Sequence, residues 1–560
     1  MANSRKRNEM VRLVALGGMD ELGKNMWLAC IGEDWLLVDA GSAFPENEML
    51  GVDMVIPDIS YLLEQPQKLR GIVLSHAHVD HIGALPYLLS QLPLPIYGSA
   101  LTIEMTKHYL KQHEFEGAVD YNIVEPGKQF KLGSIVCELF RVTHDIPDAC
   151  GIAIKSSQGW LIFSGDFKID YTPLDNKLTD LARLSEYGRE GVLCLLSDSS
   201  NAELKGSTFS ESEMGSRLEQ ALTDAGNRVI IHLGVNDLFR LQQLLWLAAN
   251  GNWQVQIASP ALEEMLAVAN RANALLLPPT PKARRERTRS NGQTKQMILT
   301  TTAPGEPFLS SLLGVGGGRS LVQKGDTIVL TGAYVPGSEK TQLQVINNLY
   351  RQGVARVIEV LSRGAYGSHA AQDELKLILS LTNPKHLIPT HGEVRQLVRH
   401  RDLAISLGWP MENVFLPENG TCVDFTNGIG EITESIAVGK LLVDGLGVGD
   451  IGGVVLRDRK QLSEDGLVIA VLAISRREDC LVCEPEIVTR GFVYEPESDQ
   501  LLDEVREKLR EHIAQISFRG KIDWAVLKGG VKDLLGKLIF DRTHRRPMIL
   551  PMILEVRRGK

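Results

Sequence analysis

The feature that most constrains this chain is the segment His76-Ala-His78-Val-Asp80-His81, which holds four side chains of the metal-ligand type within six residues. It follows residues 71–74, predicted to be an apolar strand, and precedes residues 82–89, predicted to be a helix. Imidazole and carboxylate groups suit zinc in hydrolytic sites, and alternate residues leaving a strand can converge on two neighbouring ions. A solvated turn or a nucleic-acid contact is the alternative, but neither needs this spacing. The segment therefore predicts a metal site.

More ligands are expected where later strands end, and three polar residues stand at such positions. They are His144 after residues 135–142, Asp166 after residues 161–163, and His391 after residues 386–389. Taken alone, each is more typical of a helix cap or a turn. Beside the histidine-rich segment each becomes a candidate ligand, and Asp39, which ends an apolar run, has the position of a residue that orients a ligand histidine.

Composition limits the class of protein. A chain of 560 residues, 44% hydrophobic and 23% charged, is expected to form two to four globular domains. No apolar run approaches the roughly 18 residues of a membrane span, the start lacks the apolar stretch of a signal peptide, and seven scattered cysteines are typical of reduced thiols. We therefore expect a cytoplasmic protein without a membrane partner. The net charge of −9 argues against non-specific coating of nucleic acid, but a nuclease needs only a local positive channel.

The pattern of strands and helices changes along the chain and predicts five segments. They are a sheet-rich α/β segment 1–206, an inserted parallel α/β domain 207–365, a return to the first domain 366–443, a glycine-rich linker 444–455, and a carboxy-terminal domain 456–560.

Two further segments have weaker signals. Residues 278–289 carry five basic residues, which predict either a loop that guides RNA by phosphate contacts or a solvated charged loop. Cys480-x-x-Cys483 has no second cysteine pair downstream, which favours buried thiols over a zinc site.

A resemblance to a known superfamily can now be stated. The order and spacing of Asp39, His76-x-His78-x-Asp80-His81, His144 and Asp166 resemble the successive motifs of the metallo-β-lactamase superfamily. The resemblance implies an αββα sandwich with two zinc ions, or manganese in their place. By the same resemblance, one ion is held by His76, His78 and His144, and the other by Asp80, His81 and His391. Asp166 would bridge the two ions.

Three other segments resemble the motifs of the β-CASP nucleases, which act on nucleic acids: residues 197–202, residues 367–370 and residues 389–393. A histidine in the third motif, as at His391, is the variant associated with RNA. Residues 331–340, 489–494 and 543–556 narrow the resemblance to the ribonuclease J family, along almost the whole chain. The implied fold is a metallo-β-lactamase αββα sandwich with an inserted β-CASP α/β domain and a carboxy-terminal α+β domain.

The resemblance also implies roles in catalysis. Asp198 would orient the metal site, His369 would stabilise the scissile phosphate or protonate the leaving oxygen, and Asp80 would accept a proton besides binding metal. Without the resemblance, Asp198 is more typical of a turn residue than of a catalytic one. His369 is then as typical of a helix start as of a catalytic residue. Residues expected to contact the substrate are Gly367, Ser368, His369 and Arg240.

One segment departs from the family pattern. Ribonuclease J usually has Ser-Asn-x-His-Arg where this chain has Asn236-Asp-Leu-Phe-Arg240, and that segment holds the 5′ end of the RNA. The arginine is present, but an aspartate at position 237 should repel a 5′-monophosphate.

The sequence thus predicts a zinc-dependent ribonuclease for single-stranded RNA that acts in RNA maturation and decay. We expect 5′-to-3′ exonuclease activity, with endonuclease activity as a second expectation, a homodimer or homotetramer, and a place in an RNA-degradation complex. Two alternatives stay open: a small-molecule metallo-hydrolase such as a thioesterase, and a non-catalytic subunit that pairs with an active paralogue. The inserted domain and His391 argue against the first, and the full set of seven ligand-type residues argues against the second.

Overall fold

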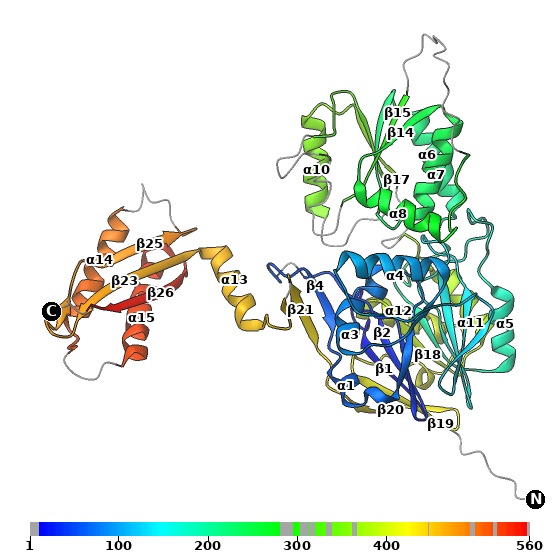
Figure 1. Cartoon of the computed structure of the whole chain (residues 1–560), viewed down its shortest axis with the longest axis horizontal. Helices are drawn as coiled ribbons and strands as arrows, with labels where there is room; N and C mark the ends of the chain where they lie inside the picture. Colours follow the sequence, from blue (N-terminus) through cyan, green and yellow to red (C-terminus); the bar gives the residue numbers. More distant parts are fainter. Residues whose placement is uncertain are drawn as a thin grey trace, which may run out of the picture. The chain divides into compact units, whose positions relative to one another are not determined.

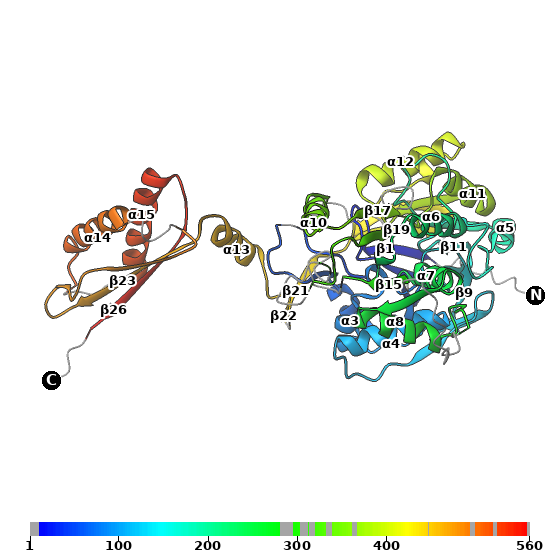
Figure 2. The same cartoon turned by 90° about the horizontal axis from the view of Figure 1, so that it is seen from above.

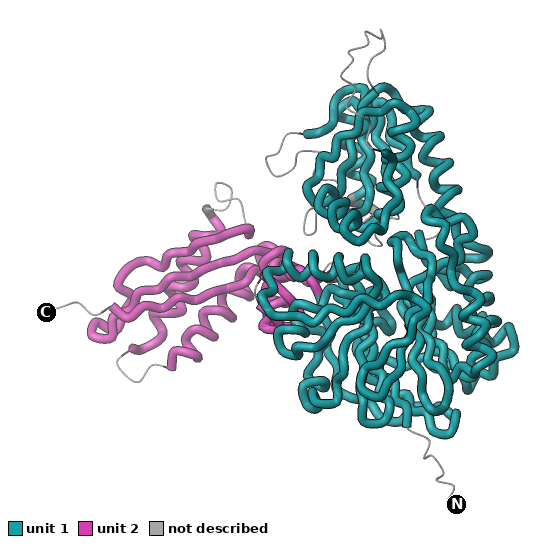
Figure 3. The backbone as a smooth tube through the Cα atoms, turned by 45° about the vertical axis from the view of Figure 1, so that its right-hand side comes forward, with its two compact units in different colours: residues 1–44, 55–441 teal, residues 45–54, 442–560 magenta. Residues whose placement is uncertain are grey.

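The computed structural model describes residues 10–46, 48–279, 295–302, 312, 320–331, 339–360, 367–445, 447–492, 499–518 and 523–556. The chain forms two compact units, residues 1–44 with 55–441 and residues 45–54 with 442–560 (Figure 3). Among the helices of these described ranges, none combines the length and the apolar character that a bilayer crossing needs.

An eight-stranded sheet forms one half of a sandwich in the first unit, in the order β20-β19-β1-β2-β3-β5-β6-β7 (Figure 1). Its strands are β1 (Val11–Gly17), β2 (Met26–Ile31), β3 (Asp34–Val38), β5 (Leu69–Val73), β6 (Ile96–Gly98), β7 (Tyr121–Ile123), β19 (Thr421–Thr426) and β20 (Ile429–Ser435). The strands from β20 to β3 pair antiparallel, and those from β3 to β7 pair parallel. The carboxyl ends of β3 and β5 therefore meet at one edge, where Asp39 and His76 follow.

A six-stranded sheet forms the other half, in the order β18-β12-β11-β10-β9-β8. Its strands are β8 (Gln129–Leu132), β9 (Ile135–Arg141), β10 (Cys150–Ser156), β11 (Gly159–Phe163), β12 (Val192–Asp198) and β18 (His386–Thr390). The last strand in the sequence, β18, returns to lie parallel to β12, with Asp198 opposite Thr390. This register brings Asp198 next to the segment that carries His391.

The two sheets pack face to face around one apolar core. Residues from both sheets contribute to it, among them Leu13 and Leu36 from the first and Leu139 and Ile152 from the second. Helix α4 (Ala100–Gln112) contacts β6 and β7, while α5 (Leu181–Glu190), α11 (Gln372–Thr382) and α12 (Val394–Ser406) contact the second sheet. The expected αββα sandwich is confirmed.

The inserted segment forms a five-stranded, fully parallel sheet in the order β14-β15-β13-β16-β17. Its strands are β13 (Arg228–His232), β14 (Trp253–Ile257), β15 (Lys295–Thr300), β16 (Thr327–Thr331) and β17 (Arg356–Val360). Parallel strands need crossover connections, and helices on both faces supply them (Figure 1). These helices are α6 (Glu211–Thr223), α7 (Leu238–Asn250), α8 (Pro260–Arg271) and α10 (Glu339–Arg351).

The second unit is an α+β structure built on the long strand β23 (Leu467–Ser475). Strand β26 (Met548–Glu555) pairs parallel with one edge of β23, and β24 (Cys480–Leu481) and β25 (Glu486–Arg490) pair with the other. Helices α14 (Asp499–Ala514) and α15 (Trp524–Thr543) cover one face of this sheet (Figure 2). Alternate residues of β23, from Val468 to Ile474, point into the core beneath them.

The second unit also contains residues 45–54, which the sequence had placed in the first domain. The peptide N–H of Asp53 donates to the carbonyl of Val443 at 2.8 Å, and the guanidinium of Arg459, on α13 (Gly453–Asp465), donates to the carbonyl of Leu50 at 2.8 Å. Backbone contacts of this kind leave no side-chain pattern in a sequence. The predicted domain limits at residues 206, 365, 443 and 455 stay predictions.

Candidate metal centre

Five strands of the sandwich end near one place, and each is followed by a residue that the sequence singled out. Asp39 follows β3, His76 follows β5, His144 follows β9, Asp166 follows β11 and His391 follows β18. Asp39 and His391 have left-handed backbones, with φ of 60° and 51°, a conformation that costs non-glycine residues free energy and tends to occur at functional sites.

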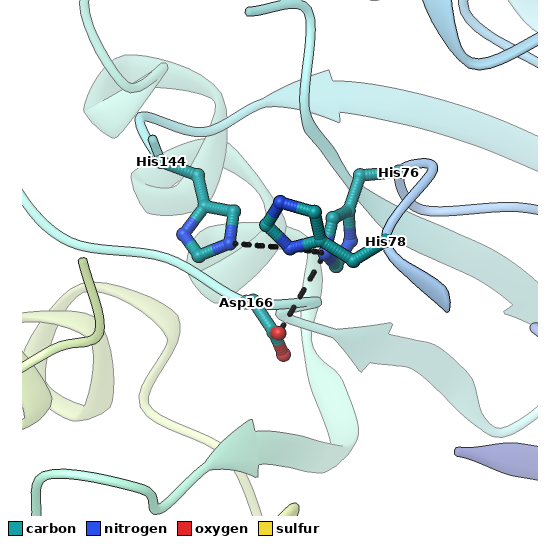
Figure 4. A group of neighbouring side chains, drawn as sticks. All are labelled: His76, His78, His144 and Asp166. Atoms are coloured by element: carbon teal, nitrogen blue, oxygen red, sulfur yellow. Dashed lines mark hydrogen bonds and ion pairs between the residues drawn. The ribbon is translucent and has the colours of Figure 1, made fainter. Parts of the chain in front are cut away.

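The first ligand group consists of His76, His78, His144 and Asp166 (Figure 4). Nδ1 of His78 lies 3.0 Å from Nε2 of His76 and 3.3 Å from Nε2 of His144, and the carboxylate of Asp166 lies 3.6 Å from Nε2 of His76. Each residue offers one ligand atom, and these atoms all lie within 4.8 Å of one another. Three imidazole nitrogens and a carboxylate turned toward one point match the donor set of a divalent cation.

The second ligand group consists of Asp80, His81, Asp166 and His391. Nε2 of His81 lies 3.1 Å from Oδ2 of Asp166, and Nδ1 of His391 lies 2.7 Å from Oδ1 of the same residue. Oδ2 of Asp80 lies 3.3 Å from Nε2 of His391. Because Asp166 is a member of both groups, the two positions are adjacent. The donors therefore fit a pair of neighbouring metal ions.

Two hydrogen bonds set the orientation of the ligand imidazoles. Nδ1 of His81 lies 2.8 Å from Oδ2 of Asp39, and Nδ1 of His144 lies 3.1 Å from the carbonyl oxygen of Ser368. Each acceptor holds the proton on Nδ1, so Nε2 is left with the lone pair that a metal needs. Asp39 is fixed in turn by the backbone N–H and the hydroxyl of Ser75, at 2.8 and 2.9 Å.

Burial and neighbouring carboxylates have opposite effects on the pKa values of the histidines. Burial, together with His81 and His78, holds the pKa of His76 well below its usual value, and burial lowers the pKa of His144 to about 4. Burial would also lower the pKa of His81 and of His391, but Asp166 and the neighbouring carboxylates raise both well above the usual value. A cation that binds to the second group must therefore displace protons.

A third pair adjoins both ligand groups. Nδ1 of His369 lies 2.7 Å from Oδ2 of Asp198, while the other oxygen of Asp198 accepts from the backbone N–H and the hydroxyl of Ser200 at 2.9 and 2.7 Å. Burial alone would lower the pKa of His369 and raise that of Asp198. The ion pair has the larger effect, because Asp198 raises the pKa of His369 and His369 lowers the pKa of Asp198. The pair adjoins the ligands, and its atoms group with Asp166 and His391.

The residues expected to contact the substrate lie in different places. Gly367 has a φ of +45°, and Ser368 next to it supplies the carbonyl that orients His144. Arg240 is buried on α7 and is not a member of a ligand group: its guanidinium donates to Oε1 of Gln243 at 2.7 Å and lies 3.7 Å from the carboxylates of Glu211 and Asp237.

Asp237 is the residue of the segment 236–240 that departs from the family pattern by its negative charge. It caps the start of α7, where its side chain accepts from the backbone N–H of Arg240 at 3.2 Å. Burial raises the pKa of Asp237 to about 7, with Asp145 and Glu211 adding to the shift.

One residue without a predicted role also lies beside the ligands. Oδ1 of Asp145 lies 3.2 Å from Nε2 of His144 and 3.4 Å from Nε2 of His78. Its position directly after His144 was the available signal. Elsewhere, the prediction that Cys480 and Cys483 are buried is wrong: both thiols are free and exposed, on and just after the two-residue strand β24. Residues 280–289 of the basic segment lie outside the described residues.

Comparison with known families covers most of the chain. The metallo-beta-lactamase superfamily model matches residues 19–190, the ribonuclease J beta-CASP domain matches 226–349, the Zn-dependent metallo-hydrolase RNA specificity domain matches 357–417, and the ribonuclease J C-terminal domain matches 454–556.

Individual relatives match over the full length. Ribonuclease J2 of Bacillus subtilis is 37% identical over 554 residues, covering 99% of this chain and 100% of the relative. Ribonuclease J 2 of Staphylococcus aureus (strain MRSA252) is 34% identical over 558 residues, again covering 99% and 100%.

Among solved structures, a protein of unknown function from Enterococcus faecalis V583 aligns with a TM-score of 0.54 and 14% identity. It covers 74% of this chain and 100% of its own, and it supports the fold alone. The ligand geometry, the four family models and the full-length relatives agree: the chain belongs to the ribonuclease J family of metal-dependent ribonucleases.

Proposed function

We propose that this protein is a two-zinc ribonuclease that degrades single-stranded RNA from the 5′ end, with endonuclease cleavage as a second activity. The observation that carries the proposal is the pair of ligand groups that share Asp166. In this proposal His76, His78 and His144 hold one ion, and Asp80, His81 and His391 hold the other. Manganese is the alternative metal, because imidazole and carboxylate donors accept both.

When bound, such a pair of ions activates water near neutral pH and stabilises the charge that develops on the phosphodiester oxygens. The chain's own residues complete the chemistry. Asp80 accepts the proton that the attacking water loses. Asp198 holds Nδ1 of His369 at 2.7 Å, so we assign Nε2 of His369 to the scissile phosphate or to the leaving oxygen.

The 5′-end preference of the enzyme depends on charges near Arg240. Three polar side chains surround this guanidinium, namely Gln243, Glu211 and Asp237. A 5′-monophosphate would have to compete with two carboxylates for Arg240. We therefore propose that cleavage depends only weakly on the group at the 5′ end.

The decisive experiment uses a 3′-labelled single-stranded RNA that carries either a 5′-monophosphate or a 5′-triphosphate. The purified protein is assayed with zinc or manganese, next to His76→Ala as the inactive control. We expect metal-dependent cleavage that His76→Ala lowers by about 10³-fold or more, because that substitution removes a ligand. Internal cuts that ignore the 5′ group would identify an endonuclease. No metal-dependent cleavage in either assay would contradict the proposal.

We further propose that the protein is a homodimer or homotetramer that works in a cytoplasmic RNA-degradation complex. The outer face of the second unit's sheet supports self-association. Leu550, Met552 and Leu554 alternate along β26 on the face opposite α14 and α15, and they are 45%, 51% and 54% exposed. An apolar row on an uncovered sheet face is typical of an interface, and closed symmetric dimers are the commonest assemblies.

A further inference from the structure

The side chain of Glu374 is a buried carboxylate at the start of α11, outside every motif that the sequence singled out. It is 3% exposed, and among the described residues it forms no ion pair with a lysine or an arginine. Burial raises the pKa of this carboxyl group, against the opposing effect of its hydrogen-bond donors. A buried carboxylate without a counter-ion is retained only where several donors replace water.

Three backbone N–H groups supply those hydrogen bonds. Oε1 of Glu374 accepts from the N–H of Ile169 at 3.1 Å, and Oε2 accepts from the N–H of Ala371 at 2.6 Å and from that of Thr208 at 3.2 Å. The hydroxyl of Thr208 lies 3.0 Å from Oε2 and 2.7 Å from the carbonyl oxygen of His369, and its single hydrogen serves one of them at a time.

The three donors come from three different segments of the first unit. Ile169 lies three residues after Asp166, and Ala371 lies two residues after His369. Thr208 precedes α6, the first helix of the inserted domain. Capping α11 would require only the N–H of Ala371, so the contacts to Ile169 and Thr208 exceed what the helix needs. Glu374 therefore joins the backbones that carry Asp166 and His369 to the entry of the inserted domain.

We propose that Glu374 is a positioning residue that fixes Asp166 and His369 relative to each other. This inference rests on the proposed function, because only RNA hydrolysis needs Asp166 and His369 to act on the same phosphate. Catalytic groups must be held within about 0.5 Å of their productive positions. A carboxylate that accepts from both segments restrains the relative movement of their backbones.

Glu374→Gln is the most direct test, because it keeps the volume of the side chain. A carboxamide has one acceptor oxygen, which will face the two N–H groups at Oε2. Its NH₂ group is then left facing the N–H of Ile169, two donors opposite each other, and the segment with Asp166 loses its contact. The matched control is Asp373→Asn, one residue away, where an exposed carboxylate pairs with Lys376 at 3.0 Å.

Two measurements distinguish positioning from simple support of the fold. With RNA and metal, we expect kcat of Glu374→Gln to fall about 10- to 100-fold while KM changes less than about 3-fold, and Asp373→Asn to match the wild type. Without RNA, the rise in unfolding midpoint on adding Zn²⁺ should be smaller in Glu374→Gln than in the wild type, because Asp166 belongs to both ligand groups.

Each outcome decides the matter. Wild-type kcat and a wild-type response to Zn²⁺ in Glu374→Gln would overturn the inference, as would equal losses in Asp373→Asn. If Glu374→Gln does not fold, Glu374→Asp replaces it, because the side chain that is one methylene shorter cannot accept from Ile169 and Ala371 together. We expect a kcat loss of about 10-fold, and an unchanged kcat would overturn the inference. A wild type that responds to Zn²⁺ but cleaves no RNA would instead refute the proposed function.

Discussion

The carboxylate of Asp166 lies within ion-pair distance of more than one histidine of the metal centre. His81 and His391 both contact its carboxylate, and its pKa is held well below the usual value although burial acts in the other direction. The same carboxylate keeps both imidazoles protonated to a higher pH than a free histidine. Metal and protons therefore compete for the same lone pairs.

This competition predicts a steep pH dependence of metal affinity. Both histidines have a raised pKa, so they are protonated below that pKa and must lose a proton before they bind metal. Lowering the pH from 8 to 6 should weaken Zn²⁺ binding by about tenfold per pH unit for each proton displaced. Titration with a chromophoric chelator as competitor, at each pH, measures the Zn²⁺ affinity. An affinity that does not change over this range would show that neither histidine is protonated when the metal enters.

At the scale of elements, a buried ion pair joins the metal centre to the inserted domain. Nζ of Lys168, two residues after Asp166, lies 2.7 Å from Oε1 of Glu211 at the start of α6. The backbone of Lys168 also pairs with Thr143, the residue before His144. The ion pair thus connects two ligand-bearing segments with α6.

We expect the pair to be strongly coupled. Lys168→Met or Glu211→Leu alone should lower the free energy of unfolding by about 1.5–3 kcal/mol, because each removes a short charged hydrogen bond. The remaining buried charge keeps an ion-pair contact at 3.7 Å, with Arg240 for Glu211 and with Asp170 for Lys168. The double variant should lose less than the sum of the two, with a coupling energy above about 1 kcal/mol. Urea unfolding of the four proteins measures it, and additive losses would show that the two charges act independently.

The sandwich and the gathering of candidate ligands at its strand ends were predictable, because an apolar strand and the polar residue that follows it are neighbours in the sequence. Glu374 was not predictable, since its contact with Ile169 joins residues 205 positions apart. The side chains around Arg240 were not predictable for the same reason, because Glu211 lies on another helix, α6. The sequence thus supplied the ligand types, while long-range hydrogen bonds decide which side chains hold them in place.

At the scale of the whole molecule, the exposed row on β26 predicts how copies associate. Met552→Lys places a charge in the middle of this row and should shift the protein to monomers, because a charge buried in an apolar interface costs several kcal/mol. Light scattering during size-exclusion chromatography measures the mass. Ile429→Lys is the control, at an apolar and more exposed position on β20 of the first unit. A mass unchanged by Met552→Lys alone would place the interface elsewhere.

The order of the ligands along the chain has a consequence for biosynthesis. His76 to Asp166 lie in the first third of the chain, but His391 follows β18, which is translated after the whole inserted domain. A ribosome that is still making the inserted domain therefore holds a nascent chain whose second ligand group is incomplete. In this order of synthesis, the messenger being read is not exposed to a finished ribonuclease until most of the coding region has been translated.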